Sequence, residues 1–61
     1  MSKINTFNTP VDTSKETMGN YYVNLYKNDL FVEGRHYEWF SGNSMMDEVR
    51  HLKSIGYTVE W

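Results

Sequence analysis

The side chains of this sequence that could do acid–base or nucleophilic chemistry lie close together near its C-terminal end. Asp47, His51 and Ser54 are spaced so that a helix would bring a carboxylate, an imidazole and a hydroxyl to one side. On an exposed helix face, these groups would have neither an oxyanion hole nor a pocket, and acyl transfer needs both. We therefore expect a solvated helix face here, with no catalytic residues and no enzymatic activity.

A second candidate for chemistry is a metal site on a strand. His36 and Glu38, together with Glu33, could offer three ligands from one strand face. Three strand residues without supporting hydrogen-bond partners bind metal weakly, so we expect neither a metal nor another cofactor. The chain has no cysteine, which excludes disulfides and Cys-ligated zinc. Its four glycines stand apart from one another and form no phosphate-binding loop.

Length and charge narrow the remaining functional classes. The 61 residues make one domain at most, and a chain of this length buries only about 60% of the surface that it exposes when unfolded. Six basic side chains against eight acidic ones give a net charge of −2, which argues against non-specific binding to nucleic acid or anionic membranes. No apolar run approaches the roughly 20 residues of a membrane span, and no signal peptide is recognisable. We expect a soluble cytoplasmic protein.

The chain divides near Gly19 into a polar part and an aromatic part. Residues 1–20 hold only five hydrophobic side chains and show neither helical nor strand periodicity. This composition predicts a flexible polar tail. The alternative is an arm that docks through Ile4, Phe7 and Val11, either onto its own domain or onto a partner.

Residues 21–61 carry nine of the ten aromatic side chains and should contain the folded domain. Apolar and polar side chains alternate over residues 21–27, which predicts a half-buried strand. Asn28 and Asp29 both tolerate positive φ, so we expect a tight hairpin turn, with the second strand beginning at Leu30.

The second strand needs an irregularity to present an apolar face. Strict alternation from its first residue would turn Tyr37 and Trp39 away from the core. One extra residue at Gly34-Arg35 would shift the alternation, because a bulge places two residues opposite one. With this bulge, Tyr37 and Trp39 face the core and Phe40 faces away.

A helix and a last strand complete the domain. Ser44, or alternatively Asn43, is expected to cap a helix that Gly56 ends, and residues 57–61 alternate as a strand. The predicted class is α+β, with a ββαβ order, a three-stranded antiparallel sheet in the order 2-1-3 and one helix on one face. The predicted core consists of Tyr21, Val23, Leu25, Leu30, Val32, Tyr37, Trp39, Met45, Val49, Leu52, Ile55, Tyr57, Val59 and Trp61.

A single helix leaves the second face of such a sheet uncovered. Aromatic side chains ringed by carboxylates would lie there, and this combination is typical of binding hot spots. The predicted partner-binding residues are Tyr22, Tyr26, Phe31, Glu33, His36, Glu38, Phe40 and Glu60. Two other interpretations remain open: the N-terminal segment folds across this face, or the rings stiffen the sheet through cross-strand pairs.

The polar beginning and the last strand carry a family resemblance. The chain starts with Met1-Ser2, Asn5-Thr6 and Val11-Asp12, and its last strand reads Gly56-Tyr57-Thr58-Val59. In these features and in its expected ββαβ order, it resembles the RNA-polymerase inhibitor of T7-like podoviruses, one of the small phage-encoded host-takeover and anti-defence proteins. Thr58 and Glu60 stand where that family has polymerase-contacting arginines. The resemblance implies a non-enzymatic blocker of a bacterial protein, with the target left open.

The sequence is therefore compatible with three functions. The first is an inhibitor of a bacterial host or defence enzyme, such as a nucleic-acid-processing enzyme, acting in the bacterial cytoplasm as anti-CRISPR proteins do. The second is a structural homodimer or a virion component. The third is a module for single-stranded nucleic acid, which Glu33, Glu38 and Glu60 disfavour because such sites need basic surroundings.

Overall fold

A four-stranded antiparallel sheet with a helix against it makes up the computed structural model, which describes residues 3–61. In chain order, the elements are β1 (Lys3–Phe7), the short 3-10 helix η1 (Thr13–Lys15), β2 (Asn20–Lys27), β3 (Leu30–Glu38), the helix α1 (Gly42–Ser54) and β4 (Thr58–Glu60). The strand order is β1-β3-β2-β4. The predicted α+β class is confirmed, and so is the order of the three predicted strands. The predicted strand number is wrong, because β1 adds a fourth.

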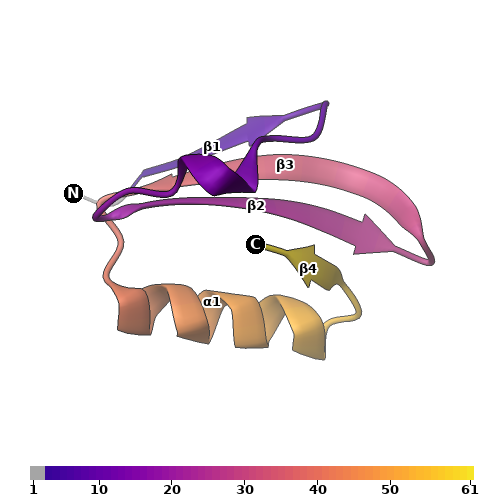
Figure 1. The fold of residues 1–61 in the computed structure, drawn as a ribbon. Coiled ribbons are helices and arrows are strands. Elements are labelled where there is room, and N and C mark those ends of the chain that lie inside the picture. The colour runs from indigo at the N-terminus through magenta and orange to yellow at the C-terminus, as the bar shows by residue number, and fades with distance from the viewer. Residues whose placement is uncertain (1–2) are drawn as a thin grey trace.

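The N-terminal segment is part of the sheet instead of a tail. β1 runs antiparallel to β3, with Lys3 opposite Glu38 and Phe7 opposite Gly34. The chain then crosses the sheet face opposite α1, so that η1 and α1 lie on opposite sides of the sheet (Figure 1). The predicted division into a tail of residues 1–20 and a domain of residues 21–61 is therefore wrong for residues 3–20, and residues 1–2 lie outside the described chain. The alternative, an arm docked on its own domain, is what the structure has.

The β2–β3 hairpin has the predicted turn and a displaced bulge. Asn28 and Asp29 have φ values of 53° and 63°, as a tight hairpin turn requires. The register shifts where Leu25 lies opposite Glu33 and the next residue of β2 lies opposite Phe31, which leaves one extra residue in β3. That extra residue is Val32, so the prediction of a bulge at Gly34-Arg35 is wrong in position.

The end of β3 also departs from the predicted orientation. Tyr37 faces α1 and is fully buried, as predicted. Trp39 is instead 70% exposed, with a left-handed φ of 65° directly after the last residue of β3. This change of backbone direction turns Phe40 inward, where its ring contacts that of Tyr37 edge-on at 5.0 Å. The orientations predicted for Trp39 and Phe40 are therefore both wrong.

The core lies between α1 and the face of the sheet that it covers. The buried side chains are Val23, Leu25, Tyr37, Met45, Val49 and Leu52, with Tyr21, Phe40, Tyr57 and Val59 partly buried against them. Five residues of the predicted core are exposed: Leu30, Val32, Trp39, Ile55 and Trp61. Val32 is the extra residue of the bulge, and Leu30 lies beside the hairpin turn opposite the exposed Lys27. Ile55 and Trp61 follow the ends of α1 and β4, where the periodicity no longer holds.

Local capping sets the ends of α1. The side chain of Ser41 accepts a hydrogen bond from the backbone N–H of Ser44 at 3.1 Å, so the predicted cap at Ser44 or Asn43 lies too late in the chain. Gly56 follows the helix with φ 105°, which confirms the predicted stop. No helix among the described residues is long and apolar enough to cross a membrane.

Candidate partner-binding surface

The face opposite α1, predicted to be open, is covered by the connection between β1 and β2. A Cβ atom placed on Gly34 would lie 2.8 Å from the carbonyl oxygen of Thr9 and 2.9 Å from Cγ1 of Val11. Only a glycine allows the connection to lie so close to β3. This is the first of the two alternatives left open for this face, in which the N-terminal segment folds across it.

Asn24 in the middle of β2 holds this connection in place. Its side chain is almost fully buried and accepts a hydrogen bond from the backbone N–H of Val11 at 2.8 Å. Its amide donates to the carbonyl oxygen of Val11 at 2.9 Å and to Oε1 of Glu60 at 2.8 Å. One side chain therefore satisfies both backbone groups of Val11 and fixes Glu60 on the same face of the sheet.

His36 and its neighbours join three strands on this face. The His36 ring stacks on Tyr22 with a centroid distance of 4.4 Å, and its Nε2 lies 3.1 Å from Oδ1 of Asn20. Asn5 of β1 places its amide nitrogen 3.4 Å from Nδ1 of His36 and 3.3 Å from Oε2 of Glu38. Of the predicted binding residues, Tyr22 on β2 thus contacts His36 on β3, and Glu38 on β3 contacts Asn5 on β1. These are cross-strand contacts of the kind that stiffen a sheet.

The remaining aromatic residues predicted for this face are only half-exposed. Tyr26 and Phe31 lie opposite each other beside the hairpin turn, with their rings edge-on at 5.8 Å. Each is partly buried, so the face offers no broad exposed aromatic patch. A partner that approached this face would contact mainly the outer side of the connection between β1 and β2.

Two of the predicted binding residues lie on the other face, toward α1. Phe40 packs against the core, and Glu33 lies opposite Leu25 because of the bulge. Glu33 forms an ion pair with Arg35, whose Nη1 donates to the Tyr37 hydroxyl at 2.9 Å. Burial raises the pKa of Tyr37 above its usual value. The prediction that Glu33 and Phe40 lie on the sheet face opposite the helix is therefore wrong.

Several of the residues considered for chemistry are engaged in other contacts. Glu33 faces away from His36 and Glu38, so these three residues do not share a face as the metal interpretation required. On α1, the Ser54 hydroxyl donates to the carbonyl oxygen of His51 at 2.6 Å. Among the described residues, there is no cluster of three or more His, Cys, Asp or Glu side chains that could hold a metal ion.

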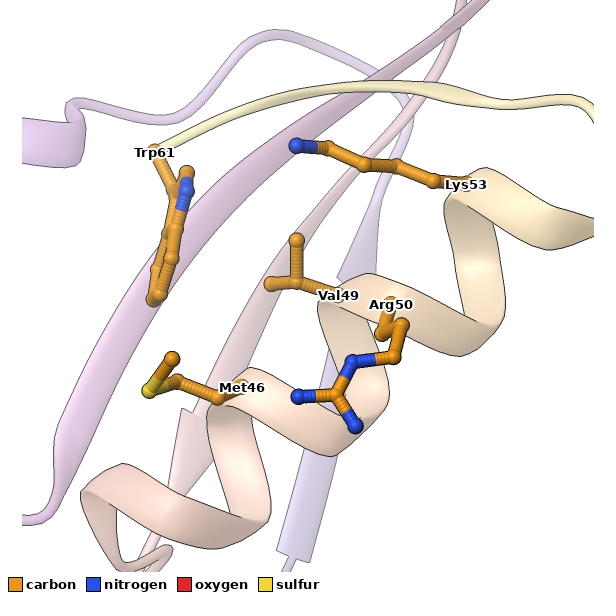
Figure 2. A pocket seen from close by; sticks show the side chains of 5 residues that line it. All are labelled: Met46, Val49, Arg50, Lys53 and Trp61. Carbon is orange, nitrogen blue, oxygen red and sulfur yellow. The ribbon is translucent and has the colours of Figure 1, made fainter.

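An apolar groove lies between α1 and the residue after β4. Its volume is about 240 Å³, and it is lined by Met46, Val49, Arg50, Lys53 and Trp61 (Figure 2). Val49 is almost fully buried and forms the floor, whereas Met46 and Trp61 are 55% and 48% exposed and form the walls. We call these five residues the α1–Trp61 groove.

Of the lining residues, Val49 and Trp61 were predicted to be in the core. Val49 is buried, whereas Trp61 is half-exposed because β4 ends at Glu60 and the alternation of the last strand stops there. Met46, Val49, Arg50 and Lys53 follow the i, i+3, i+4, i+7 spacing of one helix face, which is a sequence signal for a common surface.

The comparisons with known proteins give no relative from which to transfer a function. No protein-family model, no curated protein and no solved structure matches this chain.

Proposed function

We propose that this chain is a small non-catalytic protein that binds and blocks another protein, and that the α1–Trp61 groove is its main contact. The resemblance to small phage-encoded inhibitors makes a bacterial enzyme the proposed target. The observation that carries the proposal is the exposure of Met46 and Trp61 on either side of a buried Val49. In a domain of this size, apolar surface left uncovered beside the core is surface that a partner can bury.

The dimensions and composition of the groove favour a protein partner over a small molecule. Its volume of about 240 Å³ is below the roughly 300–1,000 Å³ of sites that enclose small molecules. It suits one or two apolar side chains inserted from outside. Tryptophan and arginine are among the residues that most often dominate protein interfaces, and a methionine wall adapts its shape to what is bound.

Capture from a bacterial lysate by the immobilised protein tests this proposal. We expect Trp61→Ala to lose a partner that the wild type retains, because removing a central aromatic anchor typically costs about 2 kcal/mol or more, or roughly thirtyfold in affinity. Leu30→Ser is the matched control, since Leu30 is an exposed apolar residue outside the groove.

The retained proteins decide the outcome. The same set bound by the wild type and by both variants would contradict a role for the groove. Sedimentation of the wild type alone tests the homodimer hypothesis: a dimer that Trp61→Ala dissociates would replace the inhibitor with a self-associating protein.

A further inference from the structure

The charged residues that line the α1–Trp61 groove are both positive. Arg50 and Lys53 lie one helical turn apart along its side, and none of the residues that line it is acidic. Lys53 makes no ion pair within the described chain, and Arg50 meets Asp47 only at 3.6 Å. Both partners of that pair are about three-quarters exposed, so solvent weakens it and Arg50 remains able to bind another carboxylate.

Two further acidic side chains, Glu60 and Glu33, do not offset these cations. Glu60, next to Trp61 in sequence, lies on the opposite face of the sheet and accepts a hydrogen bond from Asn24. Glu33 is paired with Arg35. A chain with a net charge of −2 therefore presents a cationic rim at its apolar groove.

We infer that the groove binds a partner segment in which a large apolar side chain stands next to acidic residues. The apolar side chain would lie on Val49 between Met46 and Trp61, and the carboxylates would meet Arg50 and Lys53. This inference rests on the proposed function and specifies the chemistry of the partner.

The expected selectivity is modest because the cations lie at the rim. Exposed ion pairs contribute about 1.4-fold to fivefold each in affinity, whereas a repulsive pair has the opposite effect. An acidic segment would gain two such ion pairs, and a basic segment of the same length would meet two repulsive pairs instead. We therefore expect the acidic segment to bind about tenfold more tightly at low salt, and high salt should reduce this ratio of affinities.

Two blocked peptides with the same Leu-Phe-Leu centre, one flanked by aspartates and the other by lysines, serve as probes. Each is titrated into the 15N-labelled full chain while the indole N–H signal of Trp61 is followed. We expect tighter binding of the acidic peptide by the wild type and loss of that preference in Lys53→Glu. Lys15→Glu, the same charge change on η1, should keep the preference.

The outcomes separate the inference from the proposal on which it rests. Equal binding of both peptides, or tighter binding of the basic one, would overturn the inference and leave the groove as a protein-binding site. If neither peptide moves the Trp61 signal, the groove is not a docking site, and the proposed function fails with the inference.

Discussion

Tyr37→Ala is expected to unfold the protein. Tyr37 is the largest fully buried side chain, and it combines ring contact with Phe40 and a hydrogen bond from Arg35. Truncating a buried aromatic residue costs about 3–5 kcal/mol, which is as much as a core of this size usually supplies. Circular dichroism and one-dimensional NMR would show the loss of the cooperative transition and of dispersed signals.

Trp39→Ala is the control, because the two aromatic residues lie two positions apart but differ in exposure. Trp39 is 70% exposed, so its truncation should leave a folded domain with a similar melting temperature. Tyr37→Phe keeps the ring and removes only the hydroxyl, at a cost of about 1 kcal/mol. A folded Tyr37→Ala would contradict the burial of Tyr37, and an unfolded Trp39→Ala would show that Trp39 faces the core together with Tyr37, as regular alternation expects.

Removal of residues 1–18 is the second change with a large expected effect. It deletes β1 and the connection that covers the sheet, together with both hydrogen bonds between Asn24 and Val11. Each lost hydrogen bond costs about 0.5–1.5 kcal/mol, and the lost pairing of β1 with β3 adds several more such bonds in a domain whose total stability is small. We expect thermal denaturation of the shortened chain to show no folded baseline.

Complementation distinguishes a missing structural element from general damage. A peptide of residues 3–18 added to the shortened chain should restore part of the folded signal in a concentration-dependent manner, because it supplies β1 and the Val11 backbone. A shortened chain that melts within a few degrees of the wild type would instead support the flexible tail predicted from composition.

Much of the sheet could be predicted because its signals are local. The alternation in β2 and the positive-φ residues of the hairpin turn fix the first two predicted strands, and the apolar spacing of Met45, Val49 and Leu52 fixes the buried face of α1. β1 could not be predicted in this way. Its sequence has only two apolar residues, Ile4 and Phe7, and its stability comes from pairing with β3, which is distant in the sequence.

The candidate site could be predicted less well, because small irregularities decide which side chains are exposed. A bulge at Val32 instead of Gly34 turns Glu33 toward α1, and the left-handed backbone of Trp39 exchanges the orientations of Trp39 and Phe40. Both changes are set by tertiary packing. In particular, Gly34 accommodates the Thr9 carbonyl rather than a bulge. The groove forms only because Trp61 lies beside α1 in the fold, and no pattern in the sequence predicts that proximity.

The most direct test of the account is a map of the partner's footprint on the chain. The 15N-labelled protein is mixed with the partner captured from lysate, and the amide and indole signals that shift or broaden are assigned. We expect the largest changes at Met46, Val49, Arg50, Lys53 and Trp61. Changes confined to Tyr22, Tyr26 and Phe31, with the indole signal of Trp61 unmoved, would place the contact on the sheet face and contradict the account.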